Sequence, residues 1–291
     1  MSFKSILHPT DFSDQSKVAF YHALKLALIE KSKLIVMYAM HEDKDPLDWD
    51  KFPKIRDTLH KWDLIDKDAS RNDIYKKLGI KIKKIIGKGE NIIESVSGIV
   101  YEEEVDLIVL ATHGREGLPR WLHSSISESI SRQALVPTLF VPYNSKPFVS
   151  ENNGEINLKE ILVPIDYNPA PQRAIEFGVK FGKIYGKNNV RINIMHVIEN
   201  INGETTNDMP KVDIPENENC IIRLENKHKS IEEEIIRVAK EISADLVVIP
   251  TEGRTGFVDV IFGSTSEQLL KKSTCPILTI PVAHGDYLIR E

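Results

Sequence analysis

Short runs of apolar residues alternate along the chain with segments whose apolar positions repeat every three or four residues. In the first half of the chain the apolar runs lie at 6–8, 34–39, 80–86, 107–110 and 138–141. Uninterrupted runs of this kind are typical of strands buried on both faces of a parallel sheet. Because helical periodicity fills the intervals between them, the pattern predicts an α/β fold with right-handed crossovers.

The intervals between the runs predict amphipathic helices. The helix after the first run places four apolar residues on one face, namely Ala19, Ala23, Leu26 and Ala27. The helix after the third run turns five inward, namely Ile92, Ile93, Val96, Ile99 and Val100. We expect two further helices, over Asp57–Lys77 and over about 125–134.

The whole pattern restarts near residue 160. The segment Ser5-Ile-Leu-His-Pro-Thr-Asp11 returns as Glu160-Ile-Leu-Val-Pro-Ile-Asp166. Residues 106–142 align with 245–281 without a gap, and 13 of these 37 positions are identical. The apolar runs of the second half lie at 161–163, 192–197, 220–224, 246–249 and 276–280. A repeat of this length indicates a duplicated unit, so the architecture is two similar domains in one chain.

Each copy is predicted to be a doubly wound, five-stranded parallel sheet of Rossmann-like type. We place copy one at 1–143, a polar linker at 144–158, copy two at 159–283 and a tail at 284–291. The offset between the copies falls from 155 residues at the first motif to 139 at the last, so copy two is shorter between its second and third strands. We assign the missing part to the helix over Asp57–Lys77, and we expect a loop at 200–219.

The last strand of each copy, Thr138–Val141 and Ile277–Ile280, is apolar and would otherwise be an open edge of its sheet. We therefore expect the two copies to pack against each other through these strands as a pseudo-twofold pair. One continuous sheet is not required by this argument. Further association into a homodimer remains open.

Composition mainly excludes classes of function. The net charge is −5, and neither half has the excess of lysine and arginine that nucleic-acid binders carry. The lysine-rich stretch at 76–88 is interpreted as a solvated face. Two cysteines in 291 residues do not make a disulfide framework, and no apolar run is long enough to cross a membrane. We expect a soluble, cytoplasmic protein without a nucleic-acid or membrane partner.

Ligands of such sheets bind at the carboxyl ends of the strands, where the strand order reverses. In copy two the loop after the fourth strand runs Gly253-Arg-Thr-Gly256, followed after six residues by Gly263-Ser264 at a helix start. Glycines let backbone N–H groups approach phosphate oxygens, and a helix N-terminus favours an anion. The alternative is that Ser264 with Glu267, and Ser125 with Glu128, are only capping boxes. Spacing alone leaves both interpretations open.

Other chemistry finds little support in the sequence. There is no P-loop motif, no dinucleotide-binding motif and no nucleophile–histidine–acid set that recurs in both copies. Asp11 and Asp166 either contact a nucleoside or cap the following turn, and His8 and His196 are interpreted as core histidines. An adenylating enzyme would need a Ser-Gly-Gly loop after the first strand, which Pro9-Thr-Asp11 and Pro164-Ile-Asp166 do not supply. We assign no catalytic or metal-binding residue, and slow ATP hydrolysis remains open.

Taken together, the motifs resemble those of the universal stress protein family in its tandem-domain form, and the resemblance covers nearly the whole chain twice. That family carries Gly-x-x-Gly, nine residues and Gly-Ser or Gly-Thr after its fourth strand, and this loop holds ATP phosphates in its nucleotide-binding members. A Pro-x-Asp ending the first strand and a residue ending the second contact the nucleoside. The resemblance implies a fold like the adenine nucleotide alpha hydrolases, domain pairing through the last strand, and ATP as the cofactor, with Mg²⁺ left open.

Carried onto this sequence, the resemblance implies an ATP site in copy two formed by Pro164, Asp166, Val197, Ile249, Pro250, Gly253, Arg254, Gly263, Ser264 and Thr265. It implies a weaker equivalent in copy one formed by Pro9, Asp11, Ala39, Gly114, Ser124 and Ser125.

The motif is incomplete in both copies. Ala111 and Pro250 replace the first glycine, and Pro250 has no N–H to donate. In copy one Ser124 also replaces the third glycine, and its Cβ would crowd a phosphate oxygen. We therefore expect a stress-response protein that binds ATP mainly in copy two and acts in signalling or as a scaffold. The alternative is a scaffold of the same family that binds no nucleotide.

Overall fold

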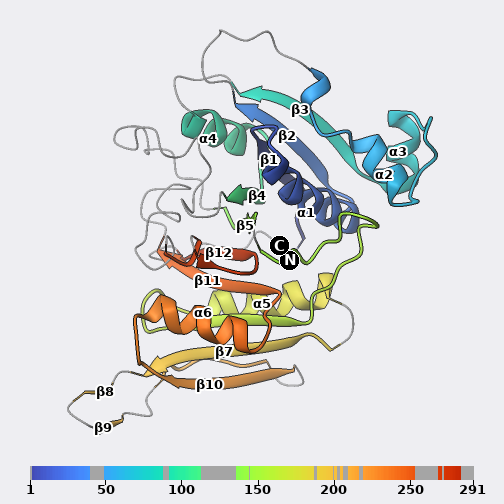
Figure 1. Ribbon diagram of the computed structural model, residues 1–291. Helices are drawn as coiled ribbons and strands as arrows, with labels where there is room; N and C mark the ends of the chain where they lie inside the picture. The colour runs from blue at the N-terminus through green and yellow to red at the C-terminus, as the bar shows by residue number, and fades with distance from the viewer. Residues whose placement is uncertain are drawn as a thin grey trace.

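A ten-stranded sheet runs through the molecule and is built from two five-stranded parallel halves (Figure 1). The computed structural model describes residues 2–39, 49–87, 92–112, 136–143, 145–186, 189–198, 200–201, 204–205, 209–215, 219–252, 268–270 and 272–282. The strand order is β3-β2-β1-β4-β5 in copy one and β10-β7-β6-β11-β12 in copy two. The doubly wound parallel fold predicted for each copy is confirmed.

The strands coincide closely with the apolar runs. Those of copy one are β1 (Ser5–Thr10), β2 (Lys33–Ala39), β3 (Lys81–Gly87), β4 (Leu107–Thr112) and β5 (Thr138–Pro142). Those of copy two are β6 (Glu160–Ile165), β7 (Arg191–Ile198), β10 (Cys220–Asn226), β11 (Leu246–Glu252) and β12 (Ile277–Val282). Strand order reverses between β1 and β4, and between β6 and β11, so each copy has one switch point.

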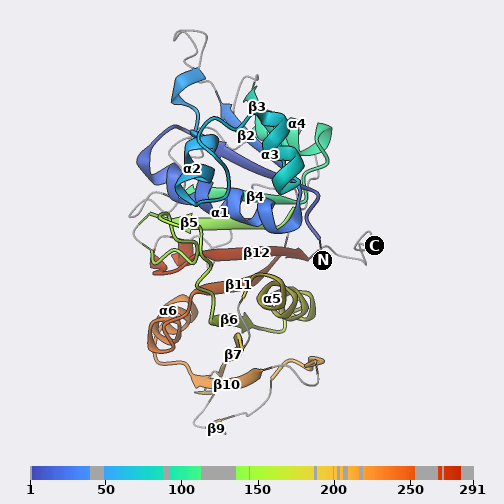
Figure 2. The same cartoon turned by 90° about the vertical axis from the view of Figure 1, so that its right-hand side faces the viewer.

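Helices cover both faces of the sheet. One face is covered by α1 (Asp14–Glu30) and α5 (Gln172–Tyr185), and the other by α4 (Ile92–Glu102) and α6 (Ile231–Glu241). Figure 2 shows α5 and α6 on opposite sides of the copy-two strands. The inward residues expected on α1 are buried, as are three of those expected on α4, namely Val96, Ile99 and Val100. The side chains of Ile92 and Ile93 and the helix expected over 125–134 lie outside the described residues.

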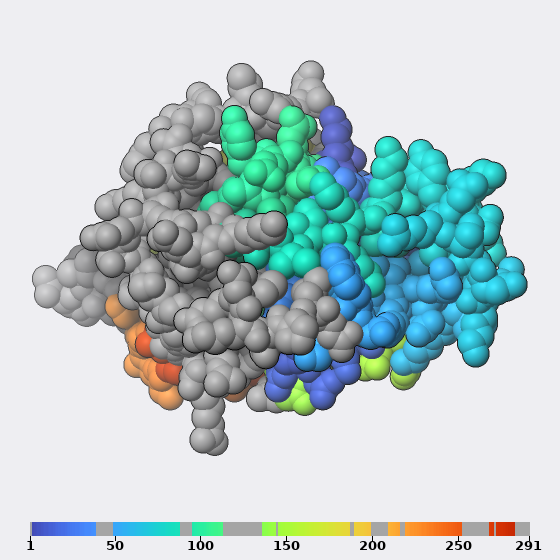
Figure 3. All heavy atoms as spheres, turned by 90° about the horizontal axis from the view of Figure 1, so that it is seen from above, coloured from blue at the N-terminus to red at the C-terminus, as the bar shows by residue number. Residues whose placement is uncertain are grey.

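The single helix expected over Asp57–Lys77 is wrong, because the segment forms two helices, α2 (Ile55–Lys61) and α3 (Arg71–Leu78). The chain turns after α2 with Asp63 at a φ of 56°. Helix α3 then starts anew at Ser70, whose hydroxyl accepts from the backbone of Asp73 while the Asp73 carboxylate accepts from the backbone of Ser70. Figure 3 shows this insertion, in cyan, on the surface of copy one.

The insertion covers the outer strands of copy one. A short turn of 3₁₀ helix, η1 (Trp49–Lys51), precedes the insertion. The buried side chains of the insertion join the core on the α1 face, namely Phe52, Ile55, Leu59, Trp62, Ile65 and Ile74. Among the described residues between β7 and β10 there is no helix. Two short antiparallel strands, β8 (Asn200–Ile201) and β9 (Glu204–Thr205), stand there instead, within the interval expected to be a loop.

The two copies meet at β5 and β12, which pair antiparallel with Leu139 opposite Leu278. The interval expected to be a polar linker packs closely at the same junction. Phe148, Val149 and Leu158 are buried, and Trp62 of the insertion donates from Nε1 to the carbonyl of Glu151 at 3.0 Å. Both core clusters contain residues of both copies, so burial is shared across the junction.

The duplication also repeats a structural carboxylate. Asp106 accepts hydrogen bonds from the backbone N–H groups of Lys4 and Ser5, at 2.7 and 3.0 Å. Its counterpart Asp245 accepts from those of Lys159 and Glu160, at 2.8 and 3.2 Å. Each carboxylate therefore fixes the start of the first strand of its own copy. Within the part of the chain that the structure describes, no helix has the length and apolar character needed to cross a membrane.

Candidate functional site

The strands beside each switch point separate toward their carboxyl ends. In copy one β1 pairs with β4 only at Ile6 and Leu7, whereas it pairs with β2 as far as Thr10. In copy two β6 pairs with β11 only at Ile161 and Leu162. The backbone groups beyond these pairs are not joined across the switch point by the ladder. This is the position at which a ligand of a doubly wound sheet binds.

In copy two the structure brings five of the expected residues to this end of the sheet. Pro164 lies in β6, Val197 near the end of β7, and Ile249 and Pro250 in β11. Asp166 follows β6 directly and is exposed, and its Oδ1 accepts from the N–H of Tyr167 at 2.8 Å. The other five expected residues lie outside the described residues, namely Gly253, Arg254, Gly263, Ser264 and Thr265.

In copy one Pro9 is buried in β1 and Ala39 ends β2. Oδ1 of Asp11 accepts from both the N–H and the hydroxyl of Ser13, at 3.0 and 2.5 Å. Ser13 is in turn the N-cap of α1. Asp11 therefore holds the turn that leads into α1. Gly114, Ser124 and Ser125 lie outside the described residues, as do the capping boxes proposed at Ser125 and Ser264.

An aromatic pair at the same end of each copy was missed by the sequence argument. Phe12, which follows Asp11 with a φ of 62°, stacks on Tyr38 of β2 with ring centroids 4.2 Å apart. In copy two Tyr167 meets His196 edge-on at 5.7 Å. Aligning the copies places Tyr167 on Phe12 and His196 on Tyr38, so the repeated rings were a signal available in the sequence. The copy-one pair is the closer one and is backed by Phe52 at 5.0 Å.

Two equivalent threonines end the central strands. Thr112 of β4 and Thr251 of β11 are buried, and neither hydroxyl has a hydrogen-bond partner among the described residues. Leaving a buried hydroxyl unsatisfied costs about 1–3 kcal/mol. Both threonines lie within the repeated motif, two positions before the glycine that it retains. The two copies therefore share an unsatisfied hydroxyl near the carboxyl end of the strand beside the switch point.

Copy two adds a cation that copy one lacks. Arg173, in the first turn of α5, is half-buried and donates from Nη1 to the carbonyl of Pro281 at 2.9 Å. Its Nε is buried without a partner among the described residues, and burial lowers the pKa of the guanidinium. Val18 stands at the equivalent position of α1. The carboxyl end of copy two therefore holds a partly desolvated positive charge.

The histidines near the switch points have the structural roles expected of them. Nδ1 of His8 lies 3.0 Å from the carbonyl of Val109, across the point where β1 and β4 separate. Burial lowers the pKa of His8 to about 4, so the ring is neutral at pH 7. Nδ1 of His196 lies 3.1 Å from the carbonyl of Ile165. No cluster of three or more His, Cys, Asp or Glu suited to a metal ion occurs among the residues described.

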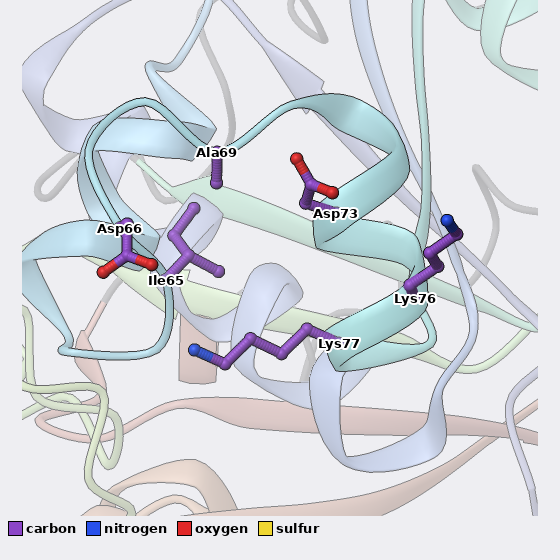
Figure 4. A pocket seen from close by; sticks show the side chains of 6 residues that line it. All are labelled: Ile65, Asp66, Ala69, Asp73, Lys76 and Lys77. Atoms are coloured by element: carbon purple, nitrogen blue, oxygen red, sulfur yellow. The ribbon is translucent and has the colours of Figure 1, made fainter.

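A hollow of about 290 Å³ opens elsewhere, on the copy-one insertion (Figure 4). It is lined by α3 and the loop before it, through Ile65, Asp66, Ala69, Asp73, Lys76 and Lys77. The Asp73 carboxylate is occupied by the backbone and hydroxyl of Ser70. The hollow is open to solvent and away from both switch points, so we do not assign it to the candidate site.

Comparison with known proteins agrees with this architecture. The family model described as "Universal stress protein family" matches residues 2–142 and 215–281. The chain is 23% identical over 319 aligned positions to the universal stress protein E homolog of Haemophilus influenzae, covering 98% of this chain and all of that protein. It is 25% identical to universal stress protein MJ0577 of Methanocaldococcus jannaschii over 48% of this chain. The crystal structure of a universal stress protein from Archaeoglobus fulgidus superposes with a TM-score of 0.56 at 18% identity, over 95% of this chain and 96% of that one.

Proposed function

The chain belongs to the universal stress protein family, and we propose that it is a stress-response protein that binds ATP at the carboxyl end of the copy-two sheet. The observation that carries this proposal is the buried Thr251 hydroxyl, which has no partner among the described residues at the end of β11. A phosphate oxygen would satisfy it. The partly desolvated Arg173 in the same copy supports an anionic ligand.

The nucleoside end of the proposed site is supported by Asp166 and Val197. Asp166 is exposed and is separated from the start of α5 by Tyr167–Pro171, so the following helix does not use its carboxylate as a cap. In this proposal the carboxylate accepts from ribose hydroxyls or an adenine edge, and Val197 provides apolar surface. Gly263, Ser264 and Thr265 would meet the phosphates with backbone N–H groups at the helix start.

Copy one is proposed to be the weaker site for three reasons. The Asp11 carboxylate is bonded to Ser13, Phe12 and Tyr38 are stacked at the strand ends, and Ser124 replaces the glycine at Gly263. Thr112 argues the other way, because its hydroxyl is unsatisfied like that of Thr251. Because both copies have this hydroxyl, it does not distinguish them, whereas the loss of one or two hydrogen bonds to a charged group would cost copy one about 1.5–3 kcal/mol each.

The test is calorimetric titration of the full chain with ATP, with and without Mg²⁺. We expect one tight site per chain, and a Gly263→Asp variant that stays folded by circular dichroism should lose it. The matched change in copy one, Ser124→Asp, should leave that site intact. Two equal sites, or loss of binding through Ser124→Asp alone, would show that the copies are assigned the wrong way round.

The alternative function, a scaffold without nucleotide, makes a different prediction for the same samples. It requires no heat of binding, and no adenine nucleotide released on denaturing the purified protein as detected by mass spectrometry. Binding that is unchanged in Gly263→Asp and Ser124→Asp would move the nucleotide away from both switch points.

A further inference from the structure

The ten-stranded sheet ends in two edge strands, β3 and β10, and their surfaces differ. Strand β3 carries lysines at 81, 83 and 84, the kind of charge that keeps an exposed edge from pairing with another chain. Strand β10 carries no lysine. It exposes Ile221, Ile222 and Leu224 instead, at 37%, 48% and 42%. Lysines therefore disfavour the pairing of another chain with β3, whereas no lysine does so at β10.

The hydrogen bonds of β10 show which of its backbone groups face outward. The N–H of Ile192 donates to the carbonyl of Asn219, and the N–H of Lys227 donates to the carbonyl of Ile198. Odd-numbered residues of β10 therefore direct their backbone groups to β7. In a parallel strand the alternate residues point the other way, so the N–H and C=O groups of 220, 222, 224 and 226 face the open edge.

We propose that β10 pairs antiparallel with β10 of a second copy of this chain, with Leu224 opposite Leu224, so that the sheet continues across a twofold axis. The register follows from charge. A pair centred on Arg223 would place the two arginines opposite each other. A pair centred on Ile222 would place Arg223 opposite Ile221. Only the pair centred on Leu224 places Arg223 opposite Glu225, and it does so twice.

The side chains suit this register. Arg223 and Glu225 lie on the α6 face, where they bond to Glu241 and Arg237, and both remain partly exposed. They would form closely spaced, non-hydrogen-bonded pairs across the axis, while Leu224 would sit in a pair joined by two backbone bonds. On the opposite face Leu224 of one copy would lie beside Leu224 of the other, and Ile222 beside Asn226, so these side chains would contact each other across the axis. The molecule already joins β5 to β12 antiparallel in this manner.

The first test is sedimentation of the full chain over a range of concentrations. We expect a monomer–dimer equilibrium, and we expect Leu224→Lys to shift it fully to monomer because two like charges would face each other. Ile29→Lys is the matched control, since Ile29 is similarly exposed at 38% but lies on α1. It should sediment as the wild type does. A wild-type chain that is monomeric at every concentration, or a dimer that survives Leu224→Lys, would overturn the proposal.

The second test reads the register and does not depend on a disruptive variant. In a Cys220→Ser background, Leu224→Cys should form an intermolecular disulfide under mild oxidation, because the two residues are opposite each other. Ile222→Cys should not, because it would face Asn226 of the other copy. Cys275 is buried and stays in both variants. Cross-linking at 222 without cross-linking at 224 would refute the register, and no cross-linking at either position would refute the interface. Neither test involves the nucleotide site.

Discussion

Copy one and copy two have the same strand order but differ in what surrounds the strands. Copy one covers its outer strands with α2 and α3, caps α1 through Ser13, and buries His8 and His22. Copy two has Val163 and Phe177 at the positions of these histidines, enters α5 without a side-chain cap, and adds Arg173. The strand order is therefore common to both copies, whereas the helices that cover the outer strands and the side chains at the strand ends differ between them.

The largest effect on stability is expected where the insertion, with helices α2 and α3, packs against the core of copy one. Leu59 of α2 is fully buried, and Leu59→Ala should lower the free energy of unfolding by about 2–5 kcal/mol. Met209, in the copy-two interval that lacks these helices, is only partly buried against the core. Met209→Ala should cost about 1 kcal/mol or less. Denaturant titration measures the change in the free energy of unfolding for both variants. Equal changes would mean that the insertion of copy one contributes no more to the core than the corresponding interval of copy two.

Acid should distinguish the copies through the buried histidines. Burial lowers the pKa of both His8 and His22 from 6.5 to about 4 in the folded protein. The folded state therefore binds these protons more weakly than the unfolded state. The free energy of unfolding is therefore at its full value above pH 6.5. It falls by about 3 kcal/mol for each histidine as the pH drops toward 4.

His8→Val, which installs the residue of copy two, should remove about half of this acid sensitivity. Unfolding free energies of the wild type and the variant, measured at several pH values between 4 and 7, give the comparison. If the free energies of unfolding of the wild type and the variant decrease in parallel over that range, His8 does not take up a proton on unfolding.

The smallest expected effect concerns the charge that only copy two carries. If ATP binds there, Arg173→Met should weaken binding about tenfold, because a charge-assisted hydrogen bond is lost. Arg191→Met is the control, since Arg191 lies at the opposite, amino end of β7 and pairs with Glu160. Titration calorimetry should show an unchanged affinity for that variant. Equal weakening by both changes would indicate a general effect of net charge and not a contact.

The sequence was most informative where a pattern was local or repeated. Apolar runs gave the ten strands of the main sheet because strands buried on both faces have few polar positions. The prediction of one helix over 57–77 was wrong, because the helical periodicity of the segment gave no sign of the turn at Asp63 or of the capping box at Ser70. The packing of the interval 144–158 was not predicted either, because Phe148 and Leu158 are too far apart in the sequence to form a pattern but belong to one core.

The candidate site divides in the same way. The location of Pro164 and Asp166 at a strand end was predictable because the duplication repeats them there. Arg173 was not, since it belongs to no repeated motif and gains meaning only from its burial beside Pro281. The contact between Phe12 and Tyr38 depends on a loop and a strand that are 26 positions apart in the chain.

By itself the sequence determined the duplication, the succession of strands and helices along the chain and the family, because hydrophobic periodicity and motif spacing are properties of neighbouring residues. Only the tertiary structure decided that the two halves form one sheet and share their cores, and that two threonine hydroxyls are buried without partners. It also decided which sheet edge is guarded by lysine and which is open. These are properties of residues brought together across the chain, and burial exists only once the chain has folded.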